Sequence, residues 1–128
     1  MSMQKRKGTA WETACTVYLR RAFEDTEGTI HRAALHGASD EGDIHGLRIG
    51  GRKAIVECKN AKTYRLREWM QEAEDEAGNA DADYGITFVK LNGLGISKVG
   101  EHLAAMPIDT FIRIVGGEVP NGGAGESS

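Results

Sequence analysis

Residues 43–59 constrain the fold of this 128-residue chain more than any other segment, because they place two apolar runs around a tight turn. Asp43–Ile49 and Lys53–Lys59 each have the length of a β-strand, and the second is apolar on both sides until its end. Gly50-Gly51 between them is typical of the turn in a β-hairpin. The sequence therefore predicts two antiparallel strands joined by a short turn.

The second of these strands ends in charged residues that share a face. Side chains alternate along a strand, so Ile55, Glu57 and Lys59 point to one side. An isolated charge is costly in a core, so a strand with this ending usually faces a cleft or a bound ion. Asp43 lies on the neighbouring strand, so the carboxylates of Asp43 and Glu57 would provide two hard oxygen ligands beside Lys59. This combination suits a divalent metal and a water that attacks a phosphodiester. A Glu-x-Lys pair is also common as a plain surface ion pair, and that alternative stays open.

Length and composition indicate one globular domain. Hydrophobic residues make up 40% of the chain and charged residues 27%, and 128 residues suffice for one core of helices packed on a sheet. No apolar run approaches the ~20 residues that span a membrane, and the N-terminus lacks the apolar segment of a signal peptide. We expect a cytoplasmic protein without a membrane partner. Cys15 and Cys58 lack C-x-x-C spacing, so both are expected to be reduced, small hydrophobic residues rather than zinc ligands.

The net charge of −3 does not indicate a nucleic-acid-binding protein, but the distribution of charge does. Basic residues gather at positions 5–7 and again within twenty residues around the hairpin, and a basic face on an acidic protein can bind a polyanion. We expect four of them to contact DNA phosphates: Arg6, Lys7, Lys62 and Arg65. A merely solvated charged surface is the alternative.

The remaining pattern predicts a mixed-sheet α/β domain over residues 1–115, followed by a flexible Gly/Ser-rich tail over 116–128. Thr9 to Glu12 fits a capping box that opens the first helix. Beyond the hairpin, the expected elements are a helix from about 10 to 25, a strand over 29–35, a helix over 64–77, a strand over 84–91, a short helix over 98–105 and a strand over 110–115.

Several short motifs occur in the order found in a known group of nucleases. They are Lys7-Gly8-Thr9-Ala10-Trp11-Glu12, Gly37-Ala38-Ser39, Asp43-Ile44, Glu57-Cys58-Lys59 and Gln71. In this respect the chain resembles the PD-(D/E)-x-K nuclease superfamily and, within it, the archaeal-type and phage Holliday junction resolvases. Gly42 stands where the superfamily's name has proline. The resemblance implies a restriction-endonuclease-like core, with a central mixed β-sheet flanked by helices.

The same resemblance assigns roles to individual residues. Asp43 and Glu57 would bind Mg²⁺, with Mn²⁺ as a substitute, and the Cys58 backbone carbonyl would supply a third oxygen. Lys59 would orient or help to deprotonate the attacking water and stabilise charge on the phosphate. As an alternative, Lys59 would simply form an ion pair with Glu57.

Three further residues have both a functional and an ordinary interpretation. Glu12 would reach the metal region from the first helix, although it is also the expected capping-box residue. Gln71 would hold water near the lysine, or be an unremarkable exposed helix residue. Ser39 would donate to a phosphate, or simply suit a glycine-rich turn. The four histidines lack the paired spacing of a zinc site, and we expect surface or supporting roles for them.

The resemblance implies a Mg²⁺-dependent, structure-selective endodeoxyribonuclease that resolves four-way (Holliday) DNA junctions during recombination or repair. It would be phage-type and act as a homodimer that makes paired, symmetric cuts. Apolar dimer contacts would come from whatever Leu66, Trp69, Met70 or the strand at 86–88 leaves exposed, unless all of these are core. Two alternatives stay open: another nuclease of the superfamily, restriction-like or involved in repair, and a non-catalytic DNA-binding module.

Overall fold

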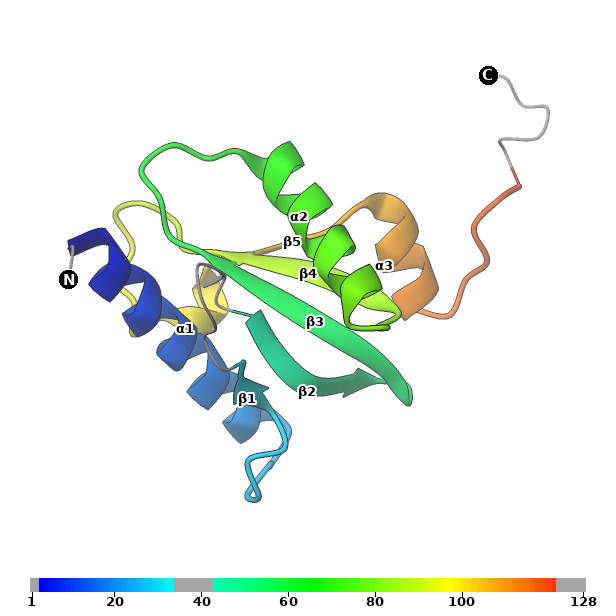
Figure 1. Ribbon diagram of the computed structural model, residues 1–128, viewed down its shortest axis with the longest axis horizontal. Coiled ribbons are helices and arrows are strands. Elements are labelled where there is room, and N and C mark those ends of the chain that lie inside the picture. Colours follow the sequence, from blue (N-terminus) through cyan, green and yellow to red (C-terminus); the bar gives the residue numbers. More distant parts are fainter. Residues whose placement is uncertain (1–2, 34–42, 122–128) are drawn as a thin grey trace.

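The protein is described by a computed structural model that covers residues 3–33 and 43–121, without the side chains of residues 3–7 and 43 (Figure 1). In chain order its elements are α1 (Met3–Ala22), β1 (His31–Arg32), β2 (Asp43–Ile49), β3 (Arg52–Lys59), α2 (Leu66–Asn79), β4 (Tyr84–Val89), the 3₁₀-helix η1 (Val99–Glu101), β5 (Leu103–Ala105) and α3 (Ile108–Ile114).

The strands form one mixed sheet in the order β1-β2-β3-β4-β5. All neighbouring pairs are antiparallel except β3 and β4, which are parallel and are connected through α2. A helical crossover is the usual way to join neighbouring parallel strands. The predicted α/β class with a mixed sheet is therefore confirmed.

One face of the sheet packs against α1. Trp11, Cys15 and Leu19 follow one another at helical spacing and join Ala54 and Val56 of β3 in a buried cluster. The Trp11 indole also donates a hydrogen bond from Nε1 to the backbone carbonyl of residue 88 in β4, at 3.2 Å. The buried cluster between α1 and the sheet is apolar.

The other face lies under α2, which crosses it at very short range (Figure 1). A Cβ atom on Gly85 would collide with the backbone carbonyl of Ala73, so glycine at this position allows the close approach of helix and strand. Two positions further along β4, the buried Thr87 hydroxyl donates to the Trp69 carbonyl at 3.3 Å. Unlike the α1 face, this face carries charged residues of β3.

The strand β2 contains a β-bulge, because its pairing with β3 shifts register between Ile44 and Leu47. Gly46 lies at the shift with a φ of 90°, which disfavours any residue with a side chain. A Cβ atom there would also collide with the Thr29 carbonyl. Gly46 thus provides both the backbone conformation and the space for the connection before β1.

The connection from α1 to β1 is held by Asp25. Its carboxylate accepts hydrogen bonds from the backbone amides of Ile30 (2.7 Å) and Thr29 (3.1 Å). The Ile30 bond is the main reason that the pKa of Asp25 lies below its usual value. Because these two amides are engaged by Asp25, β1 begins at His31 rather than at residue 29 as expected. The described pairs with β2 are those of His31 and Arg32, and residues 34–35 of the expected strand lie outside the described residues.

Two predicted elements and one predicted helix start are wrong. The helix α1 begins at Met3, so Thr9 and Glu12 lie inside it and do not form a capping box. The expected helix over 98–105 is the 3₁₀-helix η1 followed by β5, which pairs with β4. The expected strand over 110–115 is the helix α3, which follows the extended Pro107. Thr110, Ile112 and Ile114 alternate as in a strand, but Ile114 and Val115 also follow Phe111 at the helical spacings of three and four.

None of the described helices combines the length and apolar character that a membrane-spanning helix needs.

Candidate functional site

The candidate site begins with two acids on neighbouring strands. Asp43, the first residue of β2, is directly opposite Glu57 of β3 in the antiparallel ladder. The Glu57 side chain is completely buried. A buried carboxylate is stable only beside a cation or several hydrogen-bond donors, so its surroundings determine what the site can do.

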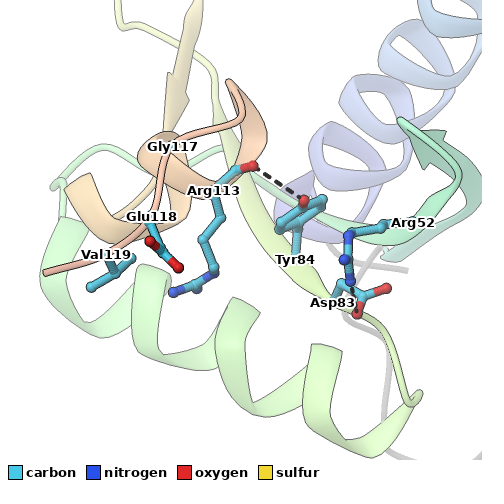
Figure 2. Close-up of a pocket in the computed structure, with 7 residues that line it drawn as sticks. All are labelled: Arg52, Asp83, Tyr84, Arg113, Gly117, Glu118 and Val119. Carbon is cyan, nitrogen blue, oxygen red and sulfur yellow. Dashed lines mark hydrogen bonds and ion pairs between the residues drawn. The ribbon is translucent and has the colours of Figure 1, made fainter. Parts of the chain in front are cut away.

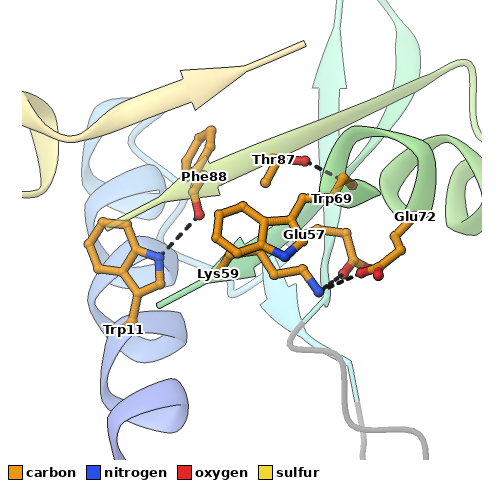
Figure 3. A network of polar contacts seen from close by, with 7 residues as sticks. All are labelled: Trp11, Glu57, Lys59, Trp69, Glu72, Thr87 and Phe88. Atoms are coloured by element: carbon orange, nitrogen blue, oxygen red, sulfur yellow. Dashed lines mark hydrogen bonds and ion pairs between the residues drawn. The ribbon is translucent and has the colours of Figure 1, made fainter. Parts of the chain in front are cut away.

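The cation beside Glu57 is the ammonium group of Lys59 (Figure 3). Lys59 Nζ lies 3.9 Å from Glu57 Oε1, which is an ion-pair distance rather than a hydrogen bond. The same Nζ lies only 2.6 Å from Oε1 of Glu72 on α2, a short charge-assisted hydrogen bond. Lys59 therefore connects the buried acid of β3 to a half-exposed acid of α2.

The expectation that alternate side chains of β3 lie on opposite faces of the sheet is therefore confirmed. Ala54 and Val56 belong to the cluster under α1, and the alternate residues Glu57 and Lys59 lie on the α2 side. Figure 3 shows the three charged groups of Glu57, Lys59 and Glu72 converging beside the buried Trp69 ring of α2. The carboxylates outnumber the ammonium in this group, before Asp43 is counted.

The thiol and the backbone carbonyl of Cys58 differ in their suitability as metal ligands. A hydrogen bond with Cys15 and burial together raise the pKa of the Cys58 thiol well above its usual value. The thiol thus stays protonated at neutral pH and is a poor metal ligand. The Lys59 carbonyl accepts a hydrogen bond from the amide of Lys90 after β4, at 2.9 Å. Because successive residues of a strand direct their backbone groups to opposite neighbours, the Cys58 carbonyl points toward the β2 side, where Asp43 lies.

Besides the Cys15 hydrogen bond and burial, the charges of Glu12 and Glu57 both help to raise the pKa of the Cys58 thiol, so Glu12 lies near the same part of β3 as Glu57. The Glu12 oxygen Oε1 is 3.0 Å from Nη2 and 3.1 Å from Nε of Arg32 in β1, so two guanidinium nitrogens converge on one carboxylate oxygen at the edge of the sheet. The helix α1 that carries it packs on the Ala54 face, opposite the side of Glu57 and Lys59. The described ion pair of Glu12 is with β1, and its role at the metal region stays a prediction.

The residue of α2 that reaches Lys59 is Glu72, which the sequence analysis missed, and not the neighbouring Gln71. The Gln71 side-chain amide donates to Asp75 Oδ1 on its own helix, at 3.1 Å, and is exposed. The helical spacing indicated this difference. Trp69 is buried, and Gln71, two positions later, lies on another side of the helix. Glu72, three positions after Trp69, is on the correct side of the helix to reach β3.

Two of the predicted phosphate contacts lie just beyond Lys59, in the connection from β3 to α2. Lys62 and Arg65 are both exposed there. This connection is tied to the loop after β4: Asn92 Nδ2 donates to the Lys62 carbonyl (2.9 Å), and the Asn92 amide donates to the Tyr64 hydroxyl (2.7 Å). The basic residues are thus held close to the end of the strand that carries Glu57 and Lys59.

Other predicted site residues cannot be placed. Ser39 lies outside the described residues, as do the side chains of Arg6, Lys7 and Asp43. Among the side chains that the structure does describe, no three His, Cys, Asp or Glu residues form a group that could hold a metal ion. Asp43, the acid opposite Glu57, is not among those side chains.

A cavity of about 340 Å³ lies at the other end of β3 and is a separate feature (Figure 2). Its cations are Arg52 and Arg113, and its acids are Asp83 and Glu118. Arg52 Nη1 lies 3.6 Å from Asp83 Oδ1, between exposed side chains. Charges of both signs are balanced here, so this cavity lacks the excess of carboxylates that characterises the Glu57 site.

The arrangement around Glu57 can supply oxygen ligands for a divalent cation, an ammonium for a neighbouring anion, and basic residues for a polyanion. Comparisons of the chain with protein-family models, curated proteins and solved structures gave no match.

Proposed function

We propose that this protein is a Mg²⁺-dependent endonuclease of the PD-(D/E)-x-K type, with a restriction-endonuclease-like core, that cuts four-way DNA junctions. The observation that carries the proposal is the completely buried Glu57, opposite Asp43 in the ladder and two residues before Lys59. A surface ion pair, the ordinary interpretation of Glu-x-Lys, does not require a fully buried acid.

The charge and chemistry of the group support a metal site. Two carboxylates share one ammonium, and Asp43 adds a third acid from the adjacent strand, so a divalent cation would relieve an excess of negative charge. Asp43, Glu57 and the Cys58 carbonyl would hold the ion with the hard oxygen ligands that Mg²⁺ and Mn²⁺ prefer. When bound, the ion would activate water and neutralise charge on the phosphate.

Lys59 supplies the protein's own contribution to the reaction. Its ammonium lies beside Glu57 and is held by Glu72, so it would donate to a phosphate oxygen or to the attacking water next to the metal ligands. Lys62 and Arg65 would bind phosphates of the same strand further from the cut.

Selectivity for the junction is the finer part of the proposal. A four-way junction is roughly two-fold symmetric and needs two opposed nicks to give two duplexes. One domain of this size carries one such site, so a two-fold homodimer is the economical way to place two sites on one junction. Linear duplex would engage only one site at a time.

The decisive experiment compares a labelled four-way junction, a linear duplex and a single strand, each with Mg²⁺, with Ca²⁺ and with a chelator. We expect paired symmetric nicks near the branch point in Mg²⁺ or Mn²⁺, binding with little cutting in Ca²⁺, and no cutting in chelator. Changing Asp43→Asn, Glu57→Gln or Lys59→Ala should each lower the cleavage rate about 10²- to 10⁴-fold while DNA binding persists.

Glu74→Gln is the matched control, because Glu74 is an exposed acid of α2 outside the charged group. It should cut at the parental rate. Full activity in excess chelator would contradict the metal mechanism. An unchanged cleavage rate for Lys59→Ala would show that the Glu-x-Lys pair has only a structural role. A protein that binds junctions and never cuts them would favour the non-catalytic DNA-binding module.

A further inference from the structure

Two histidines that lie far apart in the sequence come together on the first two strands of the sheet. His31 of β1 is the direct partner of His45 of β2 in the antiparallel ladder. Side chains of directly opposed residues lie on the same face of a sheet and close enough to interact. The two imidazole rings have their centroids 5.9 Å apart and are tilted by 30°. The strand register thus creates a histidine pair that the spacing along the sequence does not reveal.

Both rings lie on the side of the sheet that faces away from α1. Ile30 and Ile44, the residues before the two histidines, belong to the buried cluster that packs against α1. Because side chains alternate along a strand, His31 and His45 point to the opposite side. His31 is exposed and His45 is half-buried. An ion in solution can therefore reach the pair.

The backbone sets the tautomer of His31. Its Nδ1 lies 2.9 Å from the Thr29 carbonyl oxygen, and because a carbonyl only accepts hydrogen bonds, Nδ1 carries the proton. In the neutral ring, Nε2 then keeps its lone pair. Histidines that bind metals almost always have this arrangement, in which one nitrogen donates to a carbonyl or carboxylate and the other binds the metal. The same division of roles is open to His45, whose contacts extend beyond the ring pair.

Two imidazoles select a different class of metal from the carboxylates around Glu57. Imidazole nitrogen suits Zn²⁺, Cu²⁺ and Ni²⁺, whereas carboxylate oxygen suits Mg²⁺. A Zn²⁺ ion would lie about 2.0–2.1 Å from each of the two nitrogens. Among the described side chains, no third His, Cys, Asp or Glu joins the pair. Water would complete the coordination, as at an open site.

We propose that His31 and His45 form an open binding site for a transition-metal ion such as Zn²⁺, and that the ion joins β1 to β2 (Figure 1). The strand β1 has only two residues, so a metal bridge would strengthen a short edge strand. An ion that binds the folded chain and not the unfolded one raises its stability. The site is separate from the proposed Mg²⁺ site and does not depend on the nuclease function.

The test titrates the full chain with Zn²⁺ against a chromogenic chelator, in excess Mg²⁺ so that the hard oxygen ligands are occupied. His31→Ala and His45→Ala should each weaken Zn²⁺ binding at least about tenfold, the usual loss when even a supporting group of a metal site is removed. Zn²⁺ should raise the Tm of wild type but not of the double variant. Cu²⁺ should bind more tightly than Zn²⁺, and its electron paramagnetic resonance spectrum should show two nitrogen ligands in wild type and one in each single variant.

His102→Ala is the matched control, because the two ring nitrogens of His102 already bind the Leu91 amide and the Gly95 carbonyl. This variant should keep the parental Zn²⁺ affinity and the two-nitrogen Cu²⁺ spectrum. Circular dichroism verifies that each variant is folded. Equal Zn²⁺ affinity in wild type and both pair variants, or a Cu²⁺ spectrum without nitrogen ligands, overturns the site. A chain that binds Zn²⁺ as expected but cuts no DNA in Mg²⁺ leaves the site intact and contradicts the proposed function instead.

Discussion

Lys59 is the residue on which the candidate chemistry depends, and its position is set by a residue outside the strand. Its ammonium is 2.6 Å from Glu72 and 3.9 Å from Glu57, so the closest contact is with the helix. A flexible lysine side chain costs entropy to hold in one place, and a charge-assisted hydrogen bond offsets part of that cost. We therefore regard Glu72 as a positioning residue that acts through Lys59.

Replacing Glu72 tests this role. Glu72→Ala should lower kcat on the junction about 10- to 100-fold with little change in KM, because substrate still binds but the ammonium is no longer held in place. Glu72→Gln keeps a hydrogen-bond acceptor and should recover part of the loss. In a chain that already carries Lys59→Ala, the Glu72 change should add almost nothing. Fully additive losses would instead show that Glu72 acts independently of Lys59.

At the scale of elements, His102 links the loop after β4 to the core. Its Nδ1 accepts the Leu91 amide at 2.8 Å, so Nε2 carries the proton and donates to the Gly95 carbonyl, also at 2.8 Å. The imidazole packs edge-on against Trp11 of α1, with ring centroids 4.8 Å apart. The same loop contains Asn92, which binds the connection that carries Lys62. His102 thus stabilises the basic connection indirectly.

His102→Ala should lower the free energy of unfolding by about 1–3 kcal/mol, because it leaves the amide of Leu91 and the carbonyl of Gly95 without their partner. Urea unfolding gives the loss, and hydrogen exchange of the Leu91 amide should accelerate. His31→Ala is the control: His31 is exposed and its ring contacts only the nearby Thr29 carbonyl and the His45 ring in the described contacts, so the change should be small. Equal losses in both variants would contradict the linking role.

The elements also show what the sequence could predict. The hairpin was predicted closely, because Gly50-Gly51 and the alternation before Lys59 are local signals. The helix α3 was predicted as a strand, because its β-branched residues favour a strand locally and tertiary packing overrides that preference. Glu72 was missed because only the packing of α2 on β3 reveals which side of the helix reaches Lys59.

For the whole molecule, charge is unevenly distributed. The net charge is −3, yet Lys62 and Arg65 stand exposed beside the charged site. Arg65 is 3.6 Å from Glu68, a pair between exposed side chains that leaves the guanidinium accessible to a phosphate. The protein would thus bind DNA through one region rather than through its overall charge.

The salt dependence of junction binding tests whether these basic residues contact DNA phosphates. Binding to the junction should weaken steeply with salt, and Lys62→Ala and Arg65→Ala should each lower the slope of log K against log salt by about one. Arg52→Ala, at the opposite end of β3, should leave the slope unchanged because Arg52 is exposed but distant from the site. Unchanged slopes for Lys62 and Arg65 would assign them to a merely solvated surface.

The extra residue in β2 decides which side chain comes opposite Glu57. Leu47 pairs with Ala54, so an uninterrupted ladder from there would bring the apolar Ile44 opposite Glu57 and set Asp43 beside Cys58. The bulge puts the two ends of β2 one residue out of phase and makes Asp43 the partner instead. A chain that kept both acids but lost Gly46 would retain the sequence motif and lose the pairing that brings the acids together.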